Sequence, residues 1–138
     1  CLVTGYGRCA SILADRLKGM GAGVTVAGRD ASRLVQAHCL GYDTCLLKEL
    51  ESVIGEFDFI FNTIPSLVLD GALVKQLQEN AAVIDIASAP GGVDFQALKR
   101  RNIRARLCPG LPGRYSPLSS AIILYEAVME HIRDSQTQ

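Results

Sequence analysis

The chain has 138 residues, of which 49% are hydrophobic and 20% are charged, a composition typical of one globular domain with a sizeable core. Its fourteen lysines and arginines balance its fourteen aspartates and glutamates, so no overall basic charge favours nucleic acid as a partner. No apolar run is long enough to span a membrane, and the five cysteines, which include no CxxC pair, indicate neither a disulfide framework nor a metal site.

Short β-prone segments alternate with helical patterns along the chain. The predicted strands lie near residues 2–4, 23–28, 43–46, 57–63, 81–87 and 103–108, and the predicted helices near residues 8–20, 31–39, 48–54, 67–79, 94–101 and 117–133. Such alternation is typical of the α/β class. We therefore predict a Rossmann-like, doubly wound fold with a mostly parallel sheet of about six strands and helices on both faces.

The first predicted strand leads into a glycine turn, Gly5-x-Gly7-x-x-Ala10, which a helical pattern follows. In a dinucleotide-binding turn the first glycine permits the bend, the second lets the backbone approach a pyrophosphate, and a small third residue lets helix and strand pack closely. The N–H groups at the start of the helix would bind the phosphates. A glycine turn alone is weak support, and the strand before it strengthens the interpretation. The candidate cofactor-binding residues here are Gly5, Tyr6, Gly7, Arg8 and Cys9, of which we expect Cys9 to pack beneath the turn.

The sequence starts with Cys1 at the edge of this strand. We expect residues 1–138 to be a single dinucleotide-binding domain taken from a longer, two-domain protein. The unpaired set of cysteines favours a reducing, cytoplasmic location.

The end of the second predicted strand indicates which dinucleotide fits. Arg29 lies about 20 residues past the glycine turn, where an acidic residue would read a free ribose 2′-hydroxyl. An arginine can instead make bidentate contacts with a 2′-phosphate, which favours NADP over NAD. Arg29, Asp30 and Arg33 are therefore candidate cofactor-binding residues: Arg33 would add a second cation, and Asp30 could instead cap the next helix. The alternative is that both arginines are ordinary surface charges.

Three loops follow later strands, at the edge of the sheet where ligands bind in doubly wound folds. The first, after FDFIF, would line the cofactor or form a simple turn, and its candidate cofactor-binding residues are Asn62, Thr63, Ile64 and Pro65. The second, from Ser88 to Gly92, has paired glycines that would let the backbone approach a ligand closely, although a mere turn would need glycine as well, and Ser88 is a further candidate. The third, residues 108–117, is so rich in proline and glycine that we predict neither helix nor strand, but a rigid wall of the site.

Taken in order, GYGRC, the strand-end GR, FNTIPS, IDIASAPGGVDF and CPGLPGRYSP resemble the cofactor-binding domain in the A-subunit family of dipicolinate synthase over nearly the whole chain. This resemblance implies an NADP-dependent oxidoreductase that oxidises a dihydrodipicolinate-type precursor to dipicolinate during sporulation. It also implies an N-terminal domain outside this chain and a partner, the B subunit of dipicolinate synthase. Family members often carry a basic residue at the position of Ala89 and read APKT at 116–119, where this chain has SPLS.

A small-molecule dicarboxylate substrate would need a hydride acceptor, a path for a proton and cations for its carboxylates. Arg114 is the predicted catalytic residue, as a cation for the substrate, and Arg8 is a second candidate. Both are open to the alternative of being surface or phosphate-contacting arginines. We expect Asp85 and Asp94 to be a buried hydrogen-bonded carboxylate or a helix cap.

Two other functional classes remain open at this point. A different NADP-dependent dehydrogenase, of the shikimate or amino-acid dehydrogenase kind, would use the same fold, because a fold does not determine function. A nucleotide-binding assembly module without catalysis would dock a partner through the helix at 117–133. The apolar stripe on this helix, which includes Ala121, Tyr125, Val128 and Ile132, predicts a core or interface position, and self-association into a homo-oligomer is left open.

Overall fold

The computed structural model describes residues 1–136 and contains one sheet of six parallel strands. The strands are β1 (Leu2–Thr4), β2 (Thr25–Gly28), β3 (Asp43–Leu46), β4 (Phe59–Asn62), β5 (Ala82–Asp85) and β6 (Arg104–Leu107), in the order β3-β2-β1-β4-β5-β6. The chain builds the sheet outward from β1 to β3 and then returns to place β4 on the other side of β1. The carboxyl ends of β1 and β4 therefore lie side by side at the point where the strand order reverses, which is where doubly wound sheets bind ligands.

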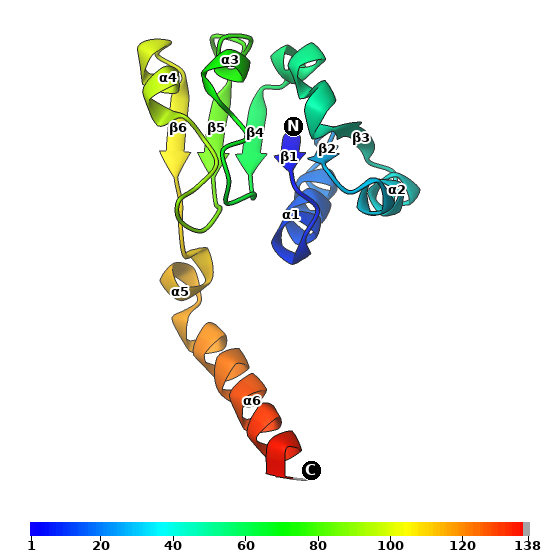
Figure 1. Cartoon of the computed structure of the whole chain (residues 1–138), viewed down its shortest axis with the longest axis vertical. Helices are drawn as coiled ribbons and strands as arrows, with labels where there is room; N and C mark the ends of the chain where they lie inside the picture. The colour runs from blue at the N-terminus through cyan, green and yellow to red at the C-terminus, as the bar shows by residue number, and fades with distance from the viewer. Residues whose placement is uncertain (137–138) are drawn as a thin grey trace.

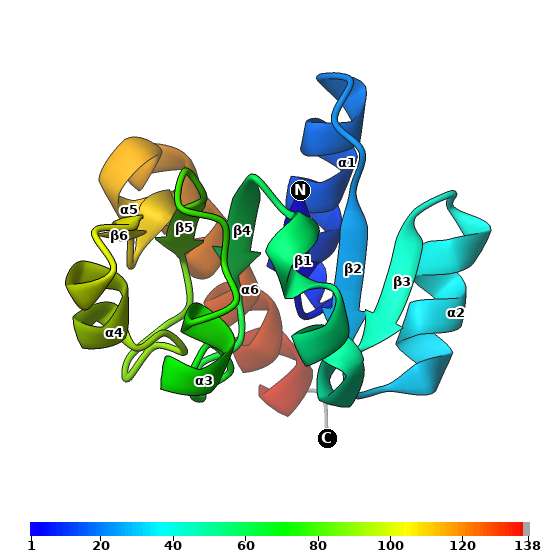
Figure 2. The ribbon, with the colours of Figure 1, turned by 90° about the horizontal axis from the view of Figure 1, so that it is seen from above.

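Helices cover both faces of this sheet, as Figure 2 shows. On one face lie α1 (Arg8–Gly19) and α2 (Ala31–Cys39), and on the other lie the 3₁₀ helices η1 (Leu47–Ser52) and η2 (Ile54–Glu56) with α3 (Gly71–Val74) and α4 (Phe95–Arg100). Leu2 and Val3 are both fully buried, yet they belong to two different hydrophobic clusters, because successive side chains of a strand point to opposite faces. The predicted doubly wound α/β class is confirmed.

The predicted helix at 67–79 is wrong in extent, since only Gly71–Val74 is an α-helix. The N–H groups of Val68 and Leu69 both donate to the C=O of Gly92, at 2.9 and 3.0 Å, and hold this segment against the loop that follows β5. The helix starts only where Asp70 accepts the N–H of Ala72 and Leu73. The predicted helix at 48–54 forms as the two short 3₁₀ helices instead.

The segment 108–117 also differs from the prediction, because Leu111–Tyr115 forms a helix, α5. Gly110 adopts a left-handed conformation, with a φ of 63°, just before the helix. Pro112 lies in the first turn, where the missing N–H of proline costs no helical hydrogen bond. Proline and glycine are thus compatible with this short helix because of where they fall.

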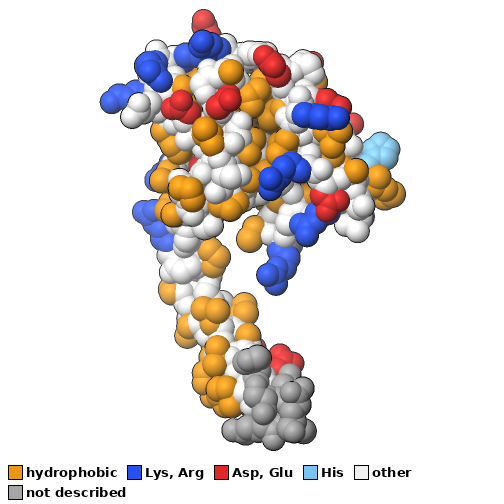
Figure 3. Space-filling view, in the orientation of Figure 1, with side chains coloured by type: hydrophobic (Ala, Val, Ile, Leu, Met, Phe, Trp, Pro, Cys, Tyr) orange, Lys and Arg blue, Asp and Glu red, His pale blue; other side chains and the backbone are white. Residues whose placement is uncertain are grey.

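The last helix, α6 (Pro117–Gln136), projects beyond the carboxyl edge of the sheet (Figure 1). Its apolar residues are largely exposed, for example Leu118 at 74% and Tyr125 at 65%, and orange side chains run along it in Figure 3. The expected core position is therefore wrong for these residues, while an interface position stays a prediction. Within the described part of the chain, no helix combines the length and hydropathy needed to cross a bilayer.

Candidate functional site: a cleft at the carboxyl edge of the sheet

A cleft of about 360 Å³ opens at the carboxyl ends of β1, β2 and β4. A wider hollow of about 940 Å³ shares Tyr6, Gly7, Asp30 and Arg33 with it and extends over α1 and α2. The residues that line the cleft come from the ends of the three strands and from α2: Gly5, Tyr6, Gly7, Gly28, Arg29, Asp30, Arg33, Leu34, Thr63, Ile64 and Pro65. Most of the predicted cofactor-binding residues are thereby brought together.

The two glycines of the turn are required for different reasons. Gly5 has a φ of +89°, and a Cβ added there would lie 2.6 Å from Thr63 Oγ1, so both backbone conformation and packing demand glycine. Gly7 has an ordinary φ of −87°, and an added Cβ would meet nothing within 4 Å. The fold therefore gives no packing reason for Gly7, and its missing side chain leaves open space in the cleft.

The N-terminus of α1 opens onto this space. Gly7 is its N-cap residue and offers no side chain to the N–H groups of the first turn, whereas Asp30, Asp70 and Asp94 cap α2, α3 and α4. The first turn contains no acidic residue. Uncapped N–H groups and the helix dipole make such an end favourable for an anion.

Arg8 and Cys9 lie in this first turn and are both exposed, and Arg8 lines the wider hollow. Cys9 does not pack beneath the turn as expected. The small residue that does so is Ala10, which is 1% exposed and packs in the same hydrophobic cluster as Val3.

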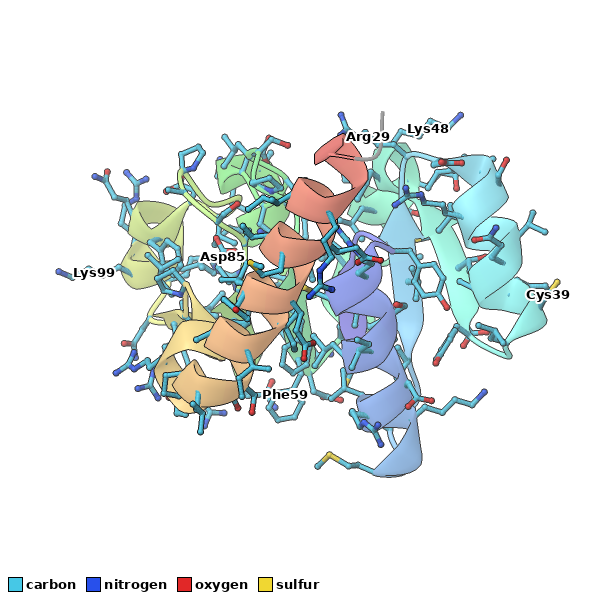
Figure 4. All side chains as sticks on the ribbon, turned by 90° about the horizontal axis from the view of Figure 1, so that it is seen from below. Arg29, Cys39, Lys48, Phe59, Asp85 and Lys99 are labelled. Atoms are coloured by element: carbon cyan, nitrogen blue, oxygen red, sulfur yellow. The ribbon has the colours of Figure 1, made fainter. Side chains whose placement is uncertain are left out.

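A cationic pair of side chains lies at the end of β2. Arg29 and Arg33 are exposed and line the cleft, and Figure 4 labels Arg29 at the edge of the fold, well apart from Asp85. Asp30 caps α2, as predicted, with Oδ1 accepting from the N–H of Ser32 at 2.9 Å and of Arg33 at 3.3 Å. Its other oxygen, Oδ2, lies 3.6 Å from Arg33 Nε. Asp30 thus orients Arg33 while leaving the net charge of the three side chains positive.

Tyr6 forms a boundary between the cleft and the wider hollow. Its ring packs edge-to-face on Tyr42, with centroids 6.2 Å apart. Partial burial raises the pKa of the Tyr6 phenol, with Tyr42 and Asp15 adding to the effect. The phenol is therefore uncharged at neutral pH and can donate a hydrogen bond.

The loop after β4 forms the opposite wall. Thr63, Ile64 and Pro65 line the cleft, and their contact with a cofactor stays a prediction. Asn62 does not: it is fully buried, and its amide is used in hydrogen bonds to Thr4, Asp85 and the Ile64 backbone. The side chain of Asn62 thus lies beneath the loop and outside the cleft lining, where it is placed to hold the loop.

Two other predicted site residues lie outside the cleft lining. Ser88 is exposed in the loop after β5, and Arg114 is exposed on α5, with its guanidinium 5.8 Å from the centroid of the Tyr115 ring. The binding role of Ser88 and the catalytic role of Arg114 stay predictions. Asp85 is a buried, hydrogen-bonded carboxylate and Asp94 caps α4, as expected.

Sequence reasoning missed two residues that shape the site. Leu34 lines the cleft from α2 and is 7% exposed, and its spacing of four residues from Asp30 could have indicated that it faces the same way. Thr4 is fully buried at the end of β1, and its position immediately before the glycine turn was the available signal.

Comparison with known proteins shows a strong likeness over nearly the whole chain. The chain is 30% identical, over 136 residues and 99% of its length, to the A subunit of dipicolinate synthase from Bacillus subtilis (strain 168), and covers 46% of that protein. The crystal structure of this B. subtilis protein matches with a TM-score of 0.93 over the same shares of both chains. The A subunit from Bacillus halodurans matches with a TM-score of 0.89 at 32% identity, over 94% of this chain and 44% of that one.

A more distant likeness shows the fold alone. Shikimate 5-dehydrogenase from Thermus thermophilus, in complex with NADP(H) and shikimate, matches with a TM-score of 0.59 at 21% identity, over 76% of this chain and 41% of that one. No family model matches the chain. The chain spans less than half the length of each of these relatives. The resemblance drawn from the sequence motifs is nevertheless confirmed: over nearly all its length, this chain is similar in sequence and structure to part of the A subunit of dipicolinate synthase.

Proposed function

We propose that this chain binds NADP⁺ and forms the cofactor-binding part of an oxidoreductase that converts a dihydrodipicolinate-type precursor to dipicolinate during sporulation. The observation that carries the proposal is the arrangement of two anion-binding features on one cleft. The uncapped start of α1 at Gly7 lies on one side, and Arg29 and Arg33 lie at the end of β2. A pyrophosphate and a 2′-phosphate are the two anionic groups of NADP⁺ that such an arrangement suits.

The residues present fit this cofactor. Open space at Gly7 allows a phosphate to reach the N–H groups of α1, where a side chain would stand in its way. Arg29 can donate two parallel hydrogen bonds to a phosphate, an interaction that the 2′-hydroxyl of NAD⁺ cannot replace. Asp30 caps α2 through Oδ1 and faces Arg33 with Oδ2, which supports a role in holding the helix and Arg33 and not in reading the ribose.

The proposed reaction removes one hydride and one proton from the substrate ring. The hydride leaves a ring carbon, and the products are aromatic dipicolinate, NADPH and a proton; the bound NADP⁺ supplies the hydride acceptor. Thr63, Ile64 and Pro65 would bound the site and limit the access of water. Arg114 is the proposed cation for a substrate carboxylate. The likeness to the A subunit of a synthase supports a partner, the B subunit of dipicolinate synthase.

The test is turnover by the protein as its gene encodes it, with and without the B subunit, followed by the fluorescence of NADPH. We expect NADPH to form with a freshly prepared dihydrodipicolinate-type substrate and not with shikimate. NADPH formation from shikimate alone would favour the other class of dehydrogenase. Nucleotide binding without turnover of either compound would favour an assembly module.

A further inference from the structure

Three polar side chains are buried at the carboxyl edge of the sheet, one at the end of each of three adjacent strands. Thr4 ends β1, Asn62 ends β4 and Asp85 ends β5, and all three are 0% exposed. The strand register pairs Thr4 with Asn62 and Asn62 with Asp85, so the three form a row across the carboxyl edge. Burying a polar group costs free energy unless the group is hydrogen-bonded. The hydrogen-bond partners of these three side chains therefore show which parts of the structure they hold in place.

Asn62, in the middle of the row, fixes the loop that forms one wall of the cleft. Its Oδ1 accepts from the Thr4 hydroxyl at 2.6 Å and from the Ile64 N–H at 3.3 Å. Its Nδ2 donates to Asp85 Oδ1 at 2.9 Å and to the Ile64 C=O at 3.0 Å. All four bonds available to the amide are made, and two of them hold the backbone of Ile64.

Asp85 fixes the next loop in the same way. Its Oδ1 also accepts from the Ala87 N–H at 3.0 Å, and its Oδ2 accepts from the Gly92 N–H at 2.9 Å. A Cβ added to Gly92 would lie 2.5 Å from Asn62 Nδ2 and 2.6 Å from the C=O of Ser66, so only glycine lets the two loops approach this closely. The loops after β4 and β5 are therefore held together through Asn62 and Asp85.

The row is also joined to the glycine turn. The Thr63 hydroxyl donates to the Thr4 C=O at 2.7 Å. The oxygen of this hydroxyl, Thr63 Oγ1, also lies beneath Gly5. The hydrogen bonds of the row thus hold the loops after β4 and β5, and Thr63, which is bonded to the backbone of Thr4, packs against the turn after β1. Those named here do not involve Arg29 or Arg33, which lie on the other side of β1 at the end of β2.

We infer that Thr4, Asn62 and Asp85 are positioning residues that shape the half of the cleft receiving the nicotinamide riboside of NADP⁺, while the adenosine half is bound independently by the end of β2. This inference rests on the proposed function, since it assigns the two ends of one dinucleotide to two sets of residues. It predicts that damage to the row weakens binding of the whole dinucleotide but not of its adenosine end.

The experiment compares two ligands by calorimetric titration: NADP⁺ and adenosine 2′,5′-bisphosphate, which retains the 2′-phosphate and lacks the nicotinamide riboside. The first variant is Thr4→Val, which removes one hydroxyl at nearly constant shape. The second is Asp85→Asn, in which the new amide NH₂ faces one of the N–H donors that the Asp85 carboxylate accepts. Thr4→Ser, which restores the hydroxyl, is the matched control. Circular dichroism and thermal unfolding report the folding of each variant.

We expect Thr4→Val and Asp85→Asn to raise the Kd for NADP⁺ about tenfold and to leave the Kd for the bisphosphate within about twofold, with Thr4→Ser close to wild type. A lower Tm with an unchanged ratio of the two Kd values would overturn the inference, because it would show a purely structural role. Should Asp85→Asn fail to fold, Thr4→Val gives the same comparison. Wild-type protein that binds neither ligand would instead contradict the proposed function itself.

Discussion

The hydroxyl of Thr63 lies directly beneath Gly5, and a Cβ added to Gly5 would be 2.6 Å from that oxygen. The hydroxyl is held there because it donates to the Thr4 C=O at 2.7 Å. Gly7, two residues later, has open space where its side chain would be. One glycine of the turn therefore serves packing, whereas the other leaves room for a ligand.

This difference separates stability from binding. We expect Gly7→Ala to change the free energy of unfolding by no more than about 1 kcal/mol, because alanine can adopt the φ of this position and its methyl group would meet no neighbouring atom. The same change should weaken NADP⁺ binding at least about tenfold, since the methyl group would occupy the approach of the pyrophosphate. Urea unfolding and calorimetry measure the two effects.

Gly5→Ala is the matched control, because it introduces the same methyl group two residues away. We expect it to destabilise the fold by about 2 kcal/mol or more, through its positive φ and its contact with Thr63. Unchanged NADP⁺ affinity in Gly7→Ala would show that this open space is not a phosphate site.

The positive end of β2 should determine cofactor preference. Arg29→Ala should lower the affinity for NADP⁺ by about 10- to 100-fold, the range expected for losing a charge-assisted hydrogen bond, and leave the affinity for NAD⁺ within about twofold. Arg16→Ala removes an exposed arginine from α1, outside the cleft lining, and serves as the control. Equal losses for both nucleotides in Arg29→Ala would mean that Arg29 does not read the 2′-phosphate.

The negative charge of Asp30 should repel the 2′-phosphate of NADP⁺, although the same side chain stabilises α2 as its cap. Asp30→Asn retains a side chain that caps well but removes a negative charge and frees Arg33 from its 3.6 Å ion pair. Affinity for NADP⁺ should rise about two- to fivefold at low salt, with a smaller gain at high salt. Asp94→Asn, the same change at the cap of α4, should leave the affinity unaltered. Weaker NADP⁺ binding by Asp30→Asn would assign the Asp30 carboxylate a direct role with the cofactor.

The cysteines provide a footprint of the bound nucleotide. Cys9 and Cys39 are exposed, while burial and, to a lesser degree, Glu49 raise the pKa of the half-buried Cys45 thiol. Because the thiolate is the reactive form, iodoacetamide should modify Cys45 last at neutral pH. NADP⁺ should slow the modification of Cys9, two residues after Gly7, more than that of Cys1, which precedes β1 at the edge of the sheet away from the cleft. Peptide mass spectrometry over time measures each rate, and equal protection of Cys9 and Cys1 would count against phosphate binding at α1.

Local patterns were sufficient to predict the main features of the site. Three of these features depend mainly on neighbouring residues: the glycine turn, the arginine at the end of β2 and the helix cap at Asp30. Their chemistry can therefore be predicted from short sequence patterns. The alternation of strands and helices likewise predicted all six strands of the sheet.

Distant contacts decide the features that the sequence did not predict. Residues 67–70 are not helical because Gly92, far along the chain, accepts the N–H groups of Val68 and Leu69. Asn62 is buried because Thr4 and Asp85 on neighbouring strands bind its amide, and nothing in the local sequence FNTIP distinguishes a buried asparagine from an exposed one. The apolar stripe of α6 is exposed for a related reason. Such a stripe predicts that one face of a helix is buried, but it does not distinguish burial in the core of the domain from burial at an interface.

The most direct test of the account is a calorimetric titration of the wild-type chain with NADP⁺ and with NAD⁺ under the same salt conditions. We predict binding of NADP⁺ at least about tenfold tighter than of NAD⁺, because only the former carries the phosphate that Arg29 and Arg33 are placed to bind. Equal affinities, or tighter binding of NAD⁺, would contradict the assignment of this cleft as an NADP⁺ site.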